Sequence, residues 1–311
     1  MLYRRLGRTG LQISELAYGA ARGYQDGSLQ TTVAAALDAG LNFFDTAGGY
    51  GDSELALGEV LQGREDVIIE TKYCPYQTYA VGAPYVGTPE ALVASAEESL
   101  RRLRRDYLDV LLGHGMRTIE SFDRFMSDGS YDAMVKLRDQ GKVRFIGISE
   151  LSEGDGTHEV LRHAVPTGAF DVVMLTLNFL LQTAADRVLP LCAKHDVGVV
   201  TMMPLNQPSP VCGLIGLPAA LEAVRRYVEH GDLPAEPPYT EETIFDFLQP
   251  YSIPEAAIRF VLSHPVTTCC VGMRSPQRLQ ENLQAAQPPY LSEKQLSHLR
   301  ELFGSIRWQV R

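Results

Sequence analysis

The chain has 311 residues, of which 45% are hydrophobic and 21% charged, an ordinary composition for a protein with a large buried core. Its formal net charge of −10 offers phosphates no positive field, so we expect neither nucleic-acid binding nor attraction to an anionic membrane. No segment reaches the roughly 18 apolar residues of a membrane span, and the N-terminus lacks a signal-peptide core. These features predict a cytoplasmic protein.

Short apolar runs alternate with helix-like stretches along the chain. The opening residues 2–13, with Gly-Arg-Thr-Gly in the middle, predict a small β-hairpin. Eight runs then follow that are nearly continuous in apolar residues, as is typical of parallel strands buried on both faces. They are Leu16–Gly19, Asn42–Asp45, Val67–Thr71, Leu108–Leu112, Arg144–Ile148, Val172–Thr176, Gly198–Met202 and Thr268–Val271.

The stretches between the runs carry helix signals. Gly follows the expected C-terminal ends, and Thr88-Pro89 forms a start signal with a cap and a first-turn proline. Helices are predicted at Thr31–Ala39, Ser53–Leu61, Pro89–Leu103, Tyr131–Gln140 and Pro254–Ser263.

Eight strands alternating with helices favour one (β/α)₈ barrel over residues 1–311, an α/β fold. An open doubly wound sheet is the competing fold, weakened because no G-x-G-x-x-G follows the first run. The long loop Asn206–Tyr251 after the seventh strand is rich in Pro and Gly at its ends. It is interpreted either as a substrate lid or as a surface insertion.

Five cysteines without CxxC spacing indicate reduced buried thiols and no metal site. Cys269 and Cys270 are adjacent in a predicted strand, so their side chains are expected on opposite faces.

Ionisable residues lie where three consecutive runs end. Asp45 closes the second run, Lys72 follows the third and His114 follows the fourth, while Tyr50 lies five residues beyond Asp45. In a barrel these positions converge on the C-terminal face. A lysine lowers the pKa of a nearby tyrosine from its usual value near 10, a carboxylate holds the lysine charged, and an imidazole orients a carbonyl. Such a set predicts proton donation to a carbonyl that receives a hydride.

Several motifs carry a family resemblance. Residues 44–54 read FDTAGGYGDSE, residues 70–72 read ETK, and residues 107–114 read YLDVLLGH. Residues 141–149 read GKVRFIGIS, and residues 271–275 read VGMRS, followed by Glu281-Asn282. In this order the sequence resembles the aldo-keto reductases over about nine-tenths of the chain.

This resemblance implies a barrel reductase of a small-molecule aldehyde, ketone or alcohol, with NADP(H) as cofactor and NAD(H) as an option. It implies Tyr50 as acid, Lys72 and Asp45 as the pair that tunes it, and His114 as the group that orients the carbonyl. It places Ser149 and Asn178 near the nicotinamide and five residues near the adenosine end. These five are Gly272, Arg274, Arg278, Glu281 and Asn282.

The departures from the family pattern gather at the nicotinamide. Glu150 replaces the usual Asn after Gly-x-Ser, and Met174 replaces the usual Gln of the sixth strand. In the seventh strand the family usually has an aromatic residue that stacks on the nicotinamide ring. Met202 lies near this position here, and its thioether is expected to cover the nicotinamide ring instead. We therefore expect a modified nicotinamide pocket. Candidate substrate-pocket aromatics are Tyr18, Tyr24, Tyr76, Tyr79 and Tyr85.

Two other functions remain open at this stage. A lysine Schiff-base enzyme would use Lys72 as a nucleophile toward a carbonyl. A cofactor-sensing regulatory subunit would bind the nucleotide without significant turnover. The sequence does not predict the oligomeric state.

Overall fold

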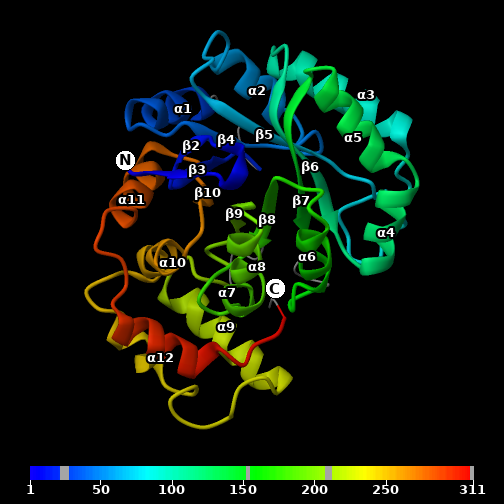
Figure 1. Ribbon diagram of the computed structural model, residues 1–311. Coiled ribbons are helices and arrows are strands. Elements are labelled where there is room, and N and C mark those ends of the chain that lie inside the picture. Colours follow the sequence, from blue (N-terminus) through cyan, green and yellow to red (C-terminus); the bar gives the residue numbers. More distant parts are fainter. Residues whose placement is uncertain (22–27, 152–154, 207–211, 309–311) are drawn as a thin grey trace.

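The computed structural model describes residues 1–21, 28–151, 155–206 and 212–308. Eight parallel strands form a closed barrel in the order β10-β3-β4-β5-β6-β7-β8-β9, surrounded by helices (Figure 1). This confirms the (β/α)₈ prediction and excludes the open sheet. The barrel strands are β3 (Leu16–Gly19), β4 (Phe43–Asp45), β5 (Ile68–Tyr73), β6 (Leu108–Met116), β7 (Val143–Glu150), β8 (Val172–Thr176), β9 (Gly198–Met202) and β10 (Thr268–Gly272).

The predicted N-terminal hairpin closes the bottom of the barrel. Strand β1 (Tyr3–Arg5) pairs antiparallel with β2 (Gln12–Ser14), and the 3₁₀ turn η1 (Gly7–Thr9) joins them. Leu6 and Ile13 are fully buried and belong to the apolar cluster inside the barrel. Because the hairpin covers this end, the barrel interior opens to a large cavity at the opposite end.

Side-chain caps explain where several helices begin. Thr88, Ser252, Ser275 and Ser292 each accept a hydrogen bond from a backbone N–H of the helix that follows. All five predicted helices are present within three residues of their expected bounds. The α-helices are α1 (Ser28–Asp38), α2 (Ser53–Val60), α3 (Pro89–Leu103), α4 (Ile119–Ser127), α5 (Ser130–Asp139), α6 (Glu159–Ala164), α7 (Thr183–Arg187), α8 (Leu189–Lys194), α9 (Leu217–His230), α10 (Ile253–Leu262), α11 (Pro276–Ala285) and α12 (Glu293–Phe303), and the further 3₁₀ turns are η2 (Val165–Thr167) and η3 (Glu242–Leu248).

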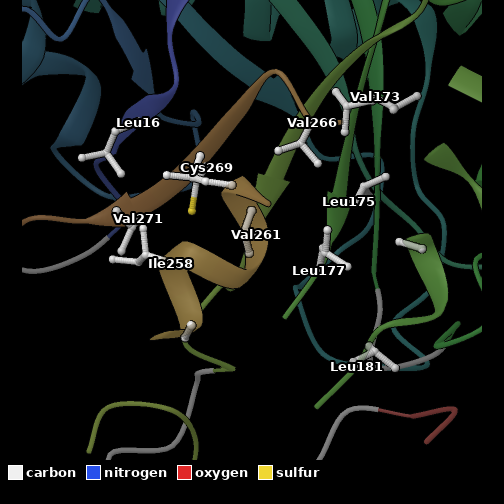
Figure 2. Close-up of a cluster of buried hydrophobic side chains, with 14 of the residues drawn as sticks. Leu16, Val173, Leu175, Leu177, Leu181, Ile258, Val261, Val266, Cys269 and Val271 are labelled. Atoms are coloured by element: carbon white, nitrogen blue, oxygen red, sulfur yellow. The ribbon is translucent and has the colours of Figure 1, made fainter. Parts of the chain in front are cut away.

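Because side chains alternate between the inner and outer faces of the barrel strands, the core has two parts. One lies inside the barrel, and the other lies between the barrel and its helices. Figure 2 shows the outer part around β3, β8, β10 and α10, where Cys269 packs near Ile258 and Val261. Cys270 belongs to the inner part. The two adjacent cysteines thus lie on opposite faces of β10, as predicted.

The described residues of the long segment after β9, 212–251, pack beside the barrel. Tyr227 of α9 is fully buried and donates to the carbonyl of Trp308, and Phe245 of η3 stacks on Phe303 of α12. No described residue between 212 and 251 lines the cavity above the barrel. For these residues the structure favours a packed insertion over a lid, while residues 207–211 lie outside the described ranges. None of the helices in the described part of the chain combines the length and apolar character needed to cross a membrane.

Candidate active site

A buried ion pair lies at the C-terminal end of β4 and β5. Lys72 is 2% exposed, and its ammonium donates to the Asp45 carboxylate and, at 2.7 Å, to the carbonyl of Thr46. Burial lowers the pKa of Lys72, but Asp45, Tyr50 and Glu70 together outweigh burial and hold the pKa above its usual value. Lys72 was expected just after its strand, but it lies within β5, with its side chain inside the barrel. The lysine is therefore a fixed cation.

Tyr50 lies beside this pair, in the turn between β4 and α2. The Lys72 ammonium is 5.1 Å from the centre of the Tyr50 ring. Burial raises the pKa of Tyr50 to about 12, and Lys72 opposes this rise. The sequence predicts the direction of the lysine effect correctly, but desolvation is the larger effect. Tyr50 consequently carries its proton throughout the neutral pH range.

His114 faces Tyr50 from β6, which is separated from β4 by β5. Their ring centres are 5.7 Å apart in an edge-on arrangement. Burial lowers the pKa of His114 well below its usual value, and the nearby cations Lys72 and Arg117 lower it further. His114 is therefore neutral at neutral pH. Its Nδ1 atom is buried and has no hydrogen-bond partner among the residues the structure describes.

One cavity of about 620 Å³ at the top of the barrel is lined by Asp45, Tyr50 and His114, and Lys72 is buried behind them. Tyr79 covers its mouth, with its ring centre 5.0 Å from that of His114 and 6.4 Å from that of Tyr50. A Cβ atom at Gly49 would lie 1.9 Å from the Tyr79 hydroxyl, so a larger residue at this position would displace the Tyr79 ring. The cavity lining includes Asp45, Tyr50, Tyr76, Tyr79, His114, Arg117, Met174, Met202, Cys270, Gly272 and Arg274.

The other predicted pocket aromatics lie elsewhere. Tyr18 is fully buried, and its hydroxyl is 2.7 Å from that of Thr32. Tyr85 packs edge-on against Tyr76 and does not line the cavity. Tyr24 falls outside the described residues. Of the four described members of this group, Tyr76 and Tyr79 therefore contribute to the cavity wall.

Arg117 is a lining residue that the sequence did not single out. Its guanidinium lies 3.8 Å from the centre of the Tyr76 ring and donates to the carbonyls of Thr78 and Ala83. It thereby fastens the loop that carries Tyr79. The sequence could have identified Arg117 from its position three residues past His114, near the end of the same strand.

Two residues predicted near the nicotinamide form hydrogen bonds to the protein backbone. Ser149 is buried, and its hydroxyl oxygen accepts from the backbone N–H of Gly115 at 2.8 Å. The side-chain oxygen of Asn178 accepts from two backbone N–H groups, and its nitrogen donates to the carbonyl of Met203. Neither lines the cavity, whereas Met174 and Met202 do. Cofactor contact by Ser149 and Asn178 stays a prediction.

Glu150 is among the residues that line the cavity, and its carboxylate forms a buried pair with His158. His158 Nδ1 lies 2.7 Å from its carboxylate, and the Thr176 backbone N–H donates to the same group. His158 Nε2 is 2.9 Å from the hydroxyl of Thr183. Burial lowers the pKa of His158, but Glu150 outweighs it, so the net pKa is raised. This residue therefore fixes the segment after β7.

The Glu150–His158 pair makes stability depend on pH. Because folding raises the pKa of His158, the pair stabilises fully below the unfolded value of about 6.5, and this contribution is lost as pH rises through the folded value. Glu150→Gln is expected to lower the Tm more at about pH 6, where His158 carries its proton, than at about pH 9. Thermal unfolding at both pH values measures this, with Glu229→Gln on the surface as control. An equal loss at both would show that His158 is uncharged in the fold.

At the far end of the cavity, β10 leads into α11. Gly272 and Arg274 line the cavity, and a Cβ atom at Gly272 would meet nothing within 4 Å. Arg274 is exposed and makes no ion pair among the described residues. Arg278 pairs with Glu281 at 2.8 Å, and Asn282 is buried with its nitrogen 3.4 Å from the Gly272 carbonyl. These groups suit the phosphate and sugar of a nucleotide, because helix N-termini and guanidinium groups attract anions.

Comparison with known proteins agrees with this geometry. The aldo/keto reductase family model matches residues 15–210. The chain is 31% identical to D-threo-aldose 1-dehydrogenase from a Pseudomonas species over 317 residues, covering 89% of this chain and 90% of that one. It is 34% identical to L-galactose dehydrogenase from Arabidopsis thaliana over 216 residues, covering 65% of each chain.

Among solved structures, the holo form of an aldo-keto reductase from Bacillus halodurans superposes with a TM-score of 0.76. The two share 23% identity, and the match covers 99% of this chain and 98% of that one. The structural match supports the fold, and the family model together with the sequence relatives decides the family. The chain belongs to the aldo-keto reductase family and is an oxidoreductase of this nicotinamide-dependent class.

Proposed function

We propose that this enzyme reduces an aldehyde or ketone to the alcohol, or catalyses the reverse reaction, with Tyr50 as the general acid. The observation that carries this proposal is the convergence of a protonated Tyr50, the Lys72–Asp45 ion pair and a neutral His114 on one cavity. A steady-state assay with reduced cofactor and a panel of small aldehydes tests it, with the alcohol identified as product.

Each side chain has a distinct task in this reaction. A bound nicotinamide supplies the hydride. The neutral His114 ring donates an N–H to the carbonyl oxygen and orients it. Tyr50 transfers its phenolic proton to that oxygen, and the Lys72 ammonium stabilises the phenolate that remains. Asp45 keeps Lys72 charged and in place, as their direct hydrogen bond supports.

The lysine environment disfavours the Schiff-base alternative. A lysine attacks a carbonyl only as the neutral amine, and the pKa of Lys72 lies above its usual value because of Asp45. Its nitrogen also donates to two oxygens already. Lys72 is thus suited to stabilising charge and poorly suited to nucleophilic attack.

For the cofactor we propose NADP(H), held at its adenosine end by Arg274 and the N-terminus of α11. Arg274 is exposed, lines the cavity and makes no ion pair among the described residues, so its charge is available to a 2′-phosphate. At the other end Met174 and Met202 form an apolar, polarisable wall for the nicotinamide ring. Arg278, Glu281 and Asn282 complete the proposed adenosine site.

Arg274→Ala is expected to raise the KM for NADPH about 10- to 100-fold while leaving the KM for NADH nearly unchanged, because a hydrogen bond to a charged group contributes roughly 1.5–3 kcal/mol. Steady-state kinetics with both cofactors measures this. Arg300→Ala, an exposed change on α12, is the control. A similar rise for both cofactors would argue against 2′-phosphate recognition by Arg274.

A further inference from the structure

A second carboxyl group lies inside the barrel beneath the ion pair. Glu70 is fully buried on β5, two residues before Lys72, and therefore points to the same interior face. Asp45 is its direct neighbour in the register of β4 and β5. Both side chains are buried, and both extend from adjacent strands into the interior of the barrel. Three charge-bearing side chains thus share one water-poor space.

The polar surroundings of Glu70 are sparse. No N–H or O–H group of a described residue donates to either of its oxygens. The charged or titratable groups facing it are Asp45 from β4, Lys72 from β5, Tyr50 and, from β10, Cys270. On its other side β6 contributes the apolar Val110 and Leu112.

The charges in this space decide where a proton resides. The Lys72 ammonium donates to Asp45 and to the Thr46 carbonyl, and among the described residues no donor is hydrogen-bonded to Glu70. Two adjacent carboxylates facing one cation in a low-dielectric interior cannot both stay ionised. Asp45 takes the charge because it has the lysine. Burial and the Asp45 charge raise the pKa of Glu70 well above its usual value.

We propose that Glu70 is a positioning residue that holds a proton and donates it in a hydrogen bond to Asp45, keeping a single negative charge beside Lys72. This inference rests on the proposed function only for its effect on catalysis. A second anion here would hinder formation of the Tyr50 phenolate. With its proton, Glu70 also holds Asp45 toward the lysine. If Asp45 loses its charge, Glu70 can ionise and replace it as the counter-ion of Lys72.

Infrared spectroscopy of the whole protein tests the protonation state without any substrate. At neutral pH the wild type should show the carbonyl-stretching band of an un-ionised carboxylic acid, and Glu70→Gln should remove it. Glu15→Gln is the matched control, because Glu15 is also buried but is bonded to Arg4 and Tyr290. In Asp45→Asn the band should disappear as Glu70 ionises. A wild type without a band that depends on Glu70 would overturn the proposal.

A double-mutant cycle tests the replacement of one carboxylate by the other. We expect kcat to fall about threefold in Glu70→Gln and about tenfold in Asp45→Asn, but by about 300-fold or more in the double variant, because only the double variant leaves Lys72 without a counter-ion. Binding of NADPH verifies folding of each variant. Additive losses, about thirtyfold in the double variant, would overturn the proposed replacement. If the wild type turns over no carbonyl while the infrared band is present, the proposed function fails and the assignment of Glu70 stands.

Discussion

Tyr50→Phe is expected to lower kcat for carbonyl reduction by about 10²- to 10⁴-fold, the usual contribution of a general acid. The change removes one oxygen and leaves the ring that packs beside Lys72 and His114. Binding of NADPH should therefore change little. Fluorescence titration of the cofactor and steady-state kinetics, performed on the same preparation, separate the two effects.

The pH dependence of the wild-type rates is a second test of the same assignment. Burial raises the pKa of Tyr50 to about 12, so the acid form is present from acidic to moderately alkaline pH. Reduction should lose rate only as pH approaches that value, whereas oxidation of the alcohol, which needs the phenolate as base, should gain rate as pH rises. Tyr79→Phe, at the cavity mouth, is the control variant. If it lost as much kcat as Tyr50→Phe, the proton donor would be misassigned.

Lys72→Met is expected to have the second-largest effect, on both rate and stability. Without the ammonium the Tyr50 phenolate loses its stabilising cation, and kcat should fall about 10²-fold or more. The Asp45 charge is also left buried without its partner, which costs about 3–5 kcal/mol in the free energy of unfolding. Denaturant unfolding measures this loss, with the exposed Lys194→Met on α8 as control.

A loss of stability in Lys72→Met that is no larger than the loss in Lys194→Met would contradict a role for Lys72 as the partner of a buried charge.

Much of the fold was predictable because a parallel barrel buries each strand on both faces. Such strands appear in the sequence as apolar runs, and all eight were identified at their correct places. The strand ends were predicted less well. The runs ended at Thr71 and Leu112, whereas β5 continues to Tyr73 and β6 to Met116. Polar residues at these ends point into the active site, so the apolar pattern stops before the strand does.

The candidate site was predicted in part. Asp45, Tyr50, Lys72 and His114 converge because strand ends meet at one face, and this depends on topology alone. The partners of Ser149, Asn178 and Glu150 depend on side-chain directions and on loop geometry, which periodicity does not encode. Glu70 had a signal: a charged residue two positions before Lys72, in the middle of an apolar strand, must face the same interior.

Wild-type turnover tests the central claim most directly. Purified enzyme with NADPH and a panel of small aldehydes and ketones should oxidise the cofactor and form the alcohol in equal amounts. Tyr50→Phe should slow both by about 10²- to 10⁴-fold while still binding NADPH. Wild-type protein that binds NADPH tightly but turns over no carbonyl in the panel, in either direction, would contradict the account and favour a cofactor-sensing role.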